Sequence, residues 1–477
     1  MKKHLLLVSF ASLACSIAFA QNRIGTGKAK DLYTLHCASC HGQNLEGGQG
    51  SSLIDDIWKY GSEDSDIVAV IENGLPDLGM IPWKGTLSDD EIRSLVILIR
   101  EQAQLADREA LNKRMEPVGG VFKSELHSFK LEKVAEAEGI IWSMDFMPDQ
   151  SILATERSGT LWHFKEGKKR RKIAGTPKVW AQGQGGLLEV QLHPDFKDNG
   201  WIYLSYSENV GAKVKNKDAS MTAVVRGRIK NAKWVDQEEI YHVAGDLHSE
   251  KGVHFGSRFV FKGGYLFFSI GDRGYQDYAQ DLTRPNGKIH RIYDDGRIPE
   301  DNPFVGTAGA VKSIWSYGHR NPQGLDMHPL TGQIWETEHG PRGGDETNLI
   351  RKAQNFGWPI ATYGMNYNGQ PITHRTSMEG VLEPKLYWVP SIAVCGIDFY
   401  EGDAFAQWKN NLFVSGMASQ ELHRLVIDGE DVLKDEIVMK NQGRVRDIAN
   451  GPDGYLYVSL TNGSPRKGEI YRLVPAD

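Results

Sequence analysis

The feature that most constrains the fold is a short alternating apolar segment that returns six times, each time after a turn containing Gly, Asn, Pro or Asp. Alternation of apolar and polar residues is the pattern of a strand with one buried face. Six such units with long inserts predict an all-β six-bladed β-propeller over residues 126–477. The alternative is a β-sandwich whose segments are similar by chance. The copies begin at Ser151, Gly200, Gly264, Gly332, Asn410 and Gly454.

A different periodicity precedes the repeats. Ser88 and Glu91 have the spacing of a capping box, and the residues that follow recur at three- and four-residue intervals on one apolar face. This pattern predicts an N-terminal all-α domain over residues 25–104. A polar, charged stretch at residues 105–125 is the expected linker. The apolar face consists of Ile92, Leu95, Val96 and Ile99.

Within the helical domain, the run CASCH places Cys37, Cys40 and His41 at the spacing of a c-type haem attachment motif. The two thiols can form thioethers with the haem vinyl groups, and the adjacent imidazole then lies against the iron. A zinc site would need more ligands than this segment offers, and a redox-active CxxC pair is the other alternative. The sequence therefore predicts a covalently bound haem with His41 as an axial ligand.

The second axial ligand is expected to be Met80. It is the only methionine between His41 and Met115, and His36 is too close in sequence to reach the opposite haem face. A single methionine is more often a core filler. Met/His ligation nevertheless suits electron transfer, because it raises the haem potential. The segment resembles the small class I cytochromes c.

The first residues predict export. Lys2 and Lys3 precede an apolar run that ends at the small-residue site around Ala20, which is the layout of a signal peptide over residues 1–20. The apolar run is shorter than a membrane span, so an anchored, integral membrane protein is disfavoured. A lipoprotein processed at Cys15 is a second alternative. We expect a periplasmic or secreted protein cleaved near Ala20.

Charge and cysteine content narrow the classes of partner. Removing Lys2 and Lys3 changes the net charge from -6 to -8, so nucleic acid is not an expected partner. Of the four cysteines, those at positions 37, 40 and 395 follow the leader, so the exported chain is not expected to depend on disulfides.

Five motifs in residues 136–473 resemble the soluble pyrroloquinoline quinone (PQQ) aldose sugar dehydrogenases. That family implies a six-bladed propeller that oxidises aldoses to lactones with PQQ and a calcium ion. The resemblance implies PQQ contacts from Gln184, Arg320, Asn321, Arg444 and Arg446. The motifs are Gly183–Leu188, Val253–Arg258, Gly318–Gly324, Glu338–Pro341 and Gly443–Asp447.

The resemblance also implies chemical roles. His254 is the expected base that takes the substrate hydroxyl proton, and Arg320 is placed to stabilise negative charge on the quinone oxygens. The carbonyls of Gly340 and Pro341 are the expected calcium ligands, since hard oxygens suit this ion. The alternatives are a surface salt bridge for Arg320, a plain turn at Gly340 and Pro341, and structural ion pairs for the arginines of the last motif.

Three positions depart from the family pattern or lack a role. Val253 stands where glucose-oxidising members carry Asp beside the catalytic His, which leaves the tuning of His254 open. Ala418 stands where they carry a Lys that contacts PQQ, so another group would have to supply that charge. Cys395 lies near the expected substrate-side loop and is also consistent with a small buried hydrophobe.

The predicted function is that of an exported quinohaemoprotein dehydrogenase. An aldose is oxidised to its lactone with PQQ, and electrons pass through the haem to an external acceptor such as a cytochrome or the quinone pool. The alternatives are oxidation of another alcohol or aldehyde such as sorbosone, and a ligand-binding propeller tethered to a cytochrome. Two other haem-and-propeller enzymes, the cytochrome nitrite reductases and the cytochrome-fused PQQ alcohol dehydrogenases, have eight blades and do not fit six repeats.

Overall fold

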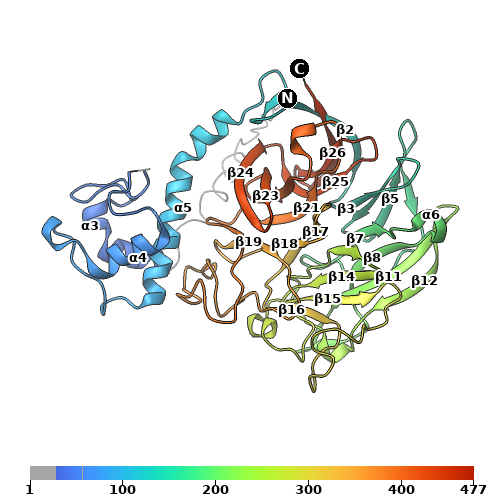
Figure 1. Cartoon of the computed structure of the whole chain (residues 1–477), viewed down its shortest axis with the longest axis horizontal. Helices are drawn as coiled ribbons and strands as arrows, with labels where there is room; N and C mark the ends of the chain where they lie inside the picture. The colour runs from blue at the N-terminus through green and yellow to red at the C-terminus, as the bar shows by residue number, and fades with distance from the viewer. Residues whose placement is uncertain (1–27, 56, 477) are drawn as a thin grey trace, which may run out of the picture. The chain divides into compact units, whose positions relative to one another are not determined.

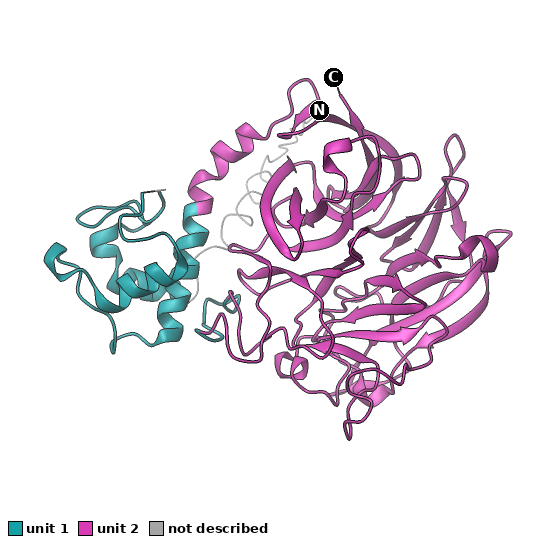
Figure 2. Cartoon of the chain, viewed as in Figure 1, with its two compact units in different colours: residues 1–103, 365–374 teal, residues 104–364, 375–477 magenta. Residues whose placement is uncertain are grey.

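The computed structural model describes residues 28–55 and 57–476 (Figure 1). The expected signal peptide at residues 1–20 lies outside them. The chain divides into two compact units (Figure 2). Unit 1 comprises the residues through Ala103 together with residues 365–374, and unit 2 comprises Gln104–Gly364 and Arg375–Asp477.

Unit 1 is helical. Its helix α5 (Asp89–Arg114) begins at the predicted capping box, where Ser88 Oγ accepts the Glu91 N–H at 3.3 Å and Glu91 Oε2 accepts the Ser88 N–H at 3.1 Å. All four residues of the predicted apolar face are at most 4% exposed. The other helices among its described residues are α2 (Lys28–His36), α3 (Ala38–His41), α4 (Asp64–Asn73) and the 3-10 helix η1 (Pro76–Leu78).

Helix α5 continues past the end of unit 1, so residues 105–114 of the expected linker are helical. None of the helices within residues 28–55 and 57–476 is long and apolar enough to cross a membrane.

Unit 2 contains six antiparallel sheets of four strands, one of them extended to five. Each predicted repeat forms the second strand of its sheet, namely β4, β8, β14, β18, β22 or β26. Each copy of the repeat therefore marks one blade, and the predicted six-bladed propeller is confirmed.

The sheets are, in chain order, β3 (Ile141–Phe146), β4 (Ile152–Glu156), β5 (Thr160–Phe164) and β6 (Arg171–Ile173); β7 (Leu187–Leu192), β8 (Ile202–Glu208), β11 (Met221–Lys230) and β12 (Lys233–Tyr241); β13 (Phe259–Lys262), β14 (Tyr265–Ile270), β15 (Lys288–Tyr293) and β16 (Ile314–Tyr317); β17 (Pro322–Met327), β18 (Ile334–Glu338), β19 (Asp345–Leu349) and β20 (Leu386–Trp388); β21 (Val394–Phe399), β22 (Leu412–Gly416), β23 (Glu421–Asp428) and β24 (Asp431–Lys440); β25 (Arg444–Asn450), β26 (Leu456–Asn462), β27 (Lys467–Pro475), β2 (Ser128–Ala137) and β1 (Phe122–Lys123). Smaller elements of unit 2 are α6 (Phe196–Asn199), β9 (Lys213–Val214), β10 (Lys217–Asp218), η2 (Gly245–Leu247), η3 (Gln276–Ala279) and η4 (Ala406–Trp408).

The two ends of unit 2 close the ring of blades. In the sixth sheet, β2 pairs with the C-terminal strand β27, with Leu131 opposite Leu473. Clusters of buried apolar side chains join each sheet to the next, and one of them joins the sixth sheet to the first through Ile470 and Ile141. Closure buries the apolar faces of the six sheets. First strands of neighbouring blades contact one another, as β3 does with β7 and β21 with β25, so these strands lie innermost in the ring.

Candidate active site and haem site

The haem attachment motif lies at the end of α2 and in α3. The Cys40 and His41 N–H groups both donate to the Cys37 carbonyl, at 3.1 and 3.0 Å, so the motif forms one helical turn. Both cysteines are free thiols, Cys37 half-buried and Cys40 exposed. One turn of helix therefore presents the two thiols together with the imidazole.

The ring of His41 is held in one orientation. Its Nδ1 lies 2.8 Å from the Ser51 carbonyl, so Nδ1–H donates and Nε2 is left to bind a metal. A Cβ on Gly50 would lie 2.8 Å from Cε1 of the ring, so this position needs glycine. Orienting an axial histidine in this way fits a haem ligand.

Met80 follows Gly79, which has a left-handed φ of 86°. The Met80 backbone exchanges hydrogen bonds with Leu75, at 3.2 and 2.8 Å, in a small antiparallel bridge. These contacts fix the loop that carries the side chain. The assignment of Met80 as second axial ligand stays a prediction.

In the propeller, a cavity of about 280 Å³ gathers four of the predicted PQQ residues: Gln184, Asn321, Arg444 and Arg446. Most of its lining residues lie in, or just before, the first strand of a blade. The remaining lining residues are Ile140, Trp142, Arg157, Gly183, Phe255, Gln323, His339, Met417 and Arg466.

His254 and Arg320 are linked to this cavity by hydrogen bonds to residues that line it. The His254 N–H donates to Gln184 Oε1 at 2.8 Å, and Arg320 Nη1 donates to the His339 carbonyl at 2.8 Å. The structure therefore brings all six predicted PQQ and catalytic residues to one place in unit 2.

The residue that orients His254 is not among those predicted from the sequence. Asp272 Oδ1 lies 2.6 Å from His254 Nδ1, and the two side chains are 1% and 14% exposed. Trp358 Nε1 donates to the other oxygen of Asp272 at 2.9 Å, which holds the carboxylate in place. Asp272 therefore supplies the carboxylate that is missing at Val253. In the sequence, the sign of its importance was its place two residues after the buried strand β14.

The charges set the protonation of this pair. Burial and then the positive charge of Arg320 lower the pKa of His254, and Asp272 offsets them only in part. Burial alone would raise the pKa of Asp272, but contact with His254 and the positive charge of Arg320 hold it below its ordinary value. At neutral pH the imidazole is thus neutral beside a carboxylate, with Nε2 able to accept a proton.

Glu338 anchors the segment that carries Arg320 and Asn321. Its Oε2 accepts the backbone N–H groups of both residues, that of Asn321 at 3.2 Å. Arg320 Nη1 also donates to the Gly340 carbonyl at 2.6 Å, and the Gly340 N–H donates to Asp345 Oδ1 at 2.8 Å.

The loop carrying the two expected calcium ligands is tightly packed. A Cβ at Gly340 would lie 2.0 Å from the Gly344 carbonyl oxygen, so only glycine fits. Gly340 and Pro341 are both buried, and carbonyl oxygens are ligands suited to calcium. Calcium binding by these two carbonyls stays a prediction.

Arg444 and Arg446 both line the cavity, as their alternation in β25 predicts. Within residues 28–55 and 57–476 neither arginine forms the structural ion pair of the alternative interpretation, and the neighbouring Asp447 pairs with Arg258 at 2.6 Å. Burial lowers the pKa of both arginines. The Nε of Arg446 is buried without a hydrogen-bond partner, so this side chain has a donor to offer an anion.

Cys395 is fully buried beneath the arginines. Its Sγ lies 4.0 Å from Arg446 Nη1 and 3.9 Å from Arg258 Nη2. Ala418 is adjacent to Met417, which lines the cavity, and supplies no charge there.

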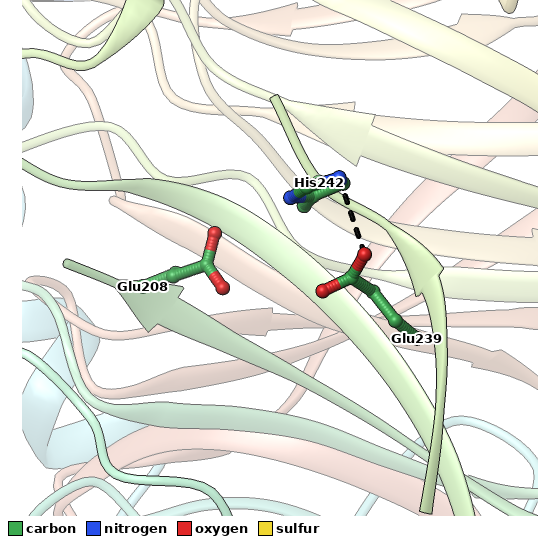
Figure 3. A group of neighbouring side chains, drawn as sticks. All are labelled: Glu208, Glu239 and His242. Carbon is green, nitrogen blue, oxygen red and sulfur yellow. Dashed lines mark ion pairs between the residues drawn. The ribbon is translucent and has the colours of Figure 1, made fainter. Parts of the chain in front are cut away.

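A separate cluster of carboxylates and imidazole lies in the second blade, near the ends of β8 and β12 (Figure 3). It consists of Glu208, Glu239 and His242, with His242 Nε2 at 3.1 Å from Glu239 Oε1. His242 and Glu239 are about half exposed, and none of the three lines the cavity.

Comparison with known proteins identifies the family. The family model Glucose / Sorbosone dehydrogenase matches residues 139–472. The chain belongs to this family. A second model, Cytochrome C oxidase, cbb3-type, subunit III, matches residues 26–99.

Among relatives, the chain is 42% identical to the aldose sugar dehydrogenase YliI of Escherichia coli K12, over 70% of this chain and 90% of that protein. It is 28% identical to the quinoprotein glucose dehydrogenase B of Acinetobacter calcoaceticus, over 70% of this chain and 84% of that protein. The crystal structure of the soluble E. coli aldose sugar dehydrogenase in its apo form superposes with a TM-score of 0.67 at 39% identity, covering 73% of this chain and 100% of that one.

These matches confirm the predicted resemblance, the cytochrome c domain and the enzyme class. The chain is an oxidoreductase of the sugar dehydrogenase type. Its cytochrome domain implies a haem, and its propeller family implies PQQ and calcium. The residues present fit the haem and PQQ. An oriented His41 lies beside two thiols, and four guanidinium groups line a cavity suited to a quinone with three carboxylates.

Proposed function

We propose that this protein oxidises an aldose to its lactone and passes the electrons through its haem to an external acceptor. When bound, PQQ supplies a two-electron acceptor in the propeller cavity and the haem supplies a one-electron relay. The substrate loses two electrons and two protons, and one of the two protons comes from the anomeric hydroxyl. Oxidation of another alcohol or aldehyde, such as sorbosone, is the second outcome that a substrate panel distinguishes.

His254 takes the hydroxyl proton on Nε2. Its Nδ1–H donates to Asp272, which fixes the tautomer that leaves Nε2 basic and stabilises the imidazolium after proton transfer. The backbone N–H of His254 donates to Gln184, so the base and a cofactor contact are positioned by one hydrogen bond. The observation that carries the proposal is the His254–Asp272 contact of 2.6 Å beside a cavity lined by arginines.

In this proposal the cofactor is bound by Gln184, Asn321, Arg444 and Arg446. The Arg320 guanidinium stabilises the negative charge that develops on the cofactor. Gly340 and Pro341 hold the calcium ion through their carbonyls.

In unit 1 of the proposed enzyme, Cys37 and Cys40 attach the haem, and His41 and Met80 complete the iron coordination. Export through the leader at residues 1–20 places the protein in the periplasm or outside the cell, where thioether attachment of haem takes place.

The test uses the full-length, haem-loaded protein with Ca²⁺ and PQQ, mixed anaerobically with a panel of aldoses and other alcohols. We expect aldoses to reduce the haem, followed in its absorption spectrum, and the product to be the lactone. Protein that binds PQQ but shows no haem reduction with any substrate contradicts the proposal. Reduction by sorbosone-like compounds alone supports the second outcome.

A further inference from the structure

The cavity of unit 2 holds two arginines that no family motif in this sequence predicts. Arg157 lies in the turn between β4 and β5, and Arg466 lies in the turn between β26 and β27. Both line the same cavity as Arg444 and Arg446. Four guanidinium groups from three separate parts of the chain therefore surround a space of about 280 Å³.

These charges are not balanced by the protein. Throughout residues 28–55 and 57–476, none of the four forms an ion pair with a carboxylate. Arg157 Nη1 donates only to the Gly183 carbonyl, and Arg446 Nη1 lies beside the Cys395 sulfur at 4.0 Å. After burial, the positive charge of Arg466 is the next cause that lowers the pKa of both Arg157 and Arg444, so the groups repel one another.

Arg157, Arg444 and Arg446 are half-buried, whereas Arg466 is exposed. Like charges gathered around a partly enclosed site are unfavourable unless an anion joins them. Position 418, where a lysine would supply a further cation, is alanine. The cavity thus lacks the cation expected there and has two others in its place.

We infer that Arg157 and Arg466 are additional cofactor-binding residues, which together with Arg444 and Arg446 neutralise the three carboxylates of PQQ and replace the lysine missing at position 418. The inference rests on the proposed function, since it assumes that PQQ is the anion. Guanidinium groups bind carboxylates through paired, charge-assisted hydrogen bonds, which suits this role.

The experiment measures PQQ binding directly, by equilibrium dialysis of PQQ against the haem-loaded, PQQ-free full-length protein with Ca²⁺. The variants are Arg157→Gln and Arg466→Gln, with Arg297→Gln as the matched control. Arg297 is an exposed arginine of the same unit, 72% exposed and paired with Asp295. We expect each cavity variant to raise the Kd for PQQ by about tenfold and the control to leave it unchanged.

A second measurement separates binding from a structural role. Removing one of four mutually repelling charges should leave the melting temperature of the PQQ-free protein unchanged or raise it, while the stabilisation by added PQQ shrinks. A residue that only supports the fold would lower the melting temperature and leave the Kd alone.

The outcomes are distinct. Wild-type protein that binds no PQQ overturns the proposed function itself. Wild-type protein that binds PQQ, with cavity variants whose Kd equals that of wild type, overturns the assignment of Arg157 and Arg466 and leaves the proposed function standing.

Discussion

The haem site of unit 1 draws all its predicted ligands from residues between Cys37 and Met80, whereas the cavity of unit 2 is lined by residues from Ile140 to Arg466. One turn of helix holds Cys37, Cys40 and His41 together. The cavity instead exists only when six sheets close into a ring. The haem site, here called the local site, needs little beyond its own segment of chain. The cavity of unit 2, here called the distributed site, needs the complete propeller.

The largest effect is expected from removing the local site. In the double variant Cys37→Ser and Cys40→Ser, covalent haem is lost completely, because no thiol remains to form a thioether. With PQQ, Ca²⁺ and an aldose, this variant should still reduce a soluble dye that replaces the haem as acceptor.

Haem content is checked by whether the chromophore survives denaturation and extraction. Dye reduction at a rate close to that of wild type keeps the two sites separable. Loss of dye reduction, in protein that still binds PQQ, would show that the cavity of unit 2 does not function independently of the haem site.

The next effect tests the distributed site. His254→Ala removes the proposed base, so the rate of substrate-driven haem reduction should fall by about 10²–10⁴-fold. Stopped-flow absorbance of the haem band measures this rate, and the oxidised haem spectrum should not change. The control is His242→Ala, an exposed histidine of the same unit outside the cavity. Equal rates for His254→Ala and wild type would remove His254 from its role.

The same contrast explains what could be predicted from sequence. The haem motif and the capping box at Ser88 are local, so spacing alone identifies them. The propeller was predictable because its signal is repeated: each alternating segment is the second strand of a blade, and six copies give the number of blades.

Asp272, Arg157 and Arg466 were not predictable in this way. Asp272 contacts a histidine 18 residues earlier, across a turn whose direction the sequence does not specify. Arg157 and Arg466 lie in turns of different blades and meet only because the ring closes. Arginines in surface turns are common, so neither position stands out before the cavity is seen.

A smaller effect is expected from Asp272→Asn, which keeps the size of the side chain and removes its charge. The rate of haem reduction should fall by roughly 10–100-fold, since the partner that orients a reacting imidazole is changed. Asp272 raises the pKa of His254, so the substitution should lower that pKa further. The rate falls as the pH drops through the pKa of the base, so this acidic limb should move to lower pH in the variant. A pH–rate profile measures it, and an acidic limb that stays in place would mean that His254 is not the titrating group.

The smallest effect returns to the local unit. Ser88→Ala removes the hydroxyl that accepts the Glu91 N–H at the start of α5, and loss of such a cap costs about 0.5–2 kcal/mol. The haem unit should therefore melt several degrees lower, followed by circular dichroism in the haem band, while Ser88→Thr, which keeps a hydroxyl, should melt close to wild type. The Kd for PQQ should be the same in all three proteins, because the cavity draws none of its lining from residues before Ile140. A higher Kd for PQQ in Ser88→Ala would show that the distributed site depends on the helical unit and not on ring closure alone.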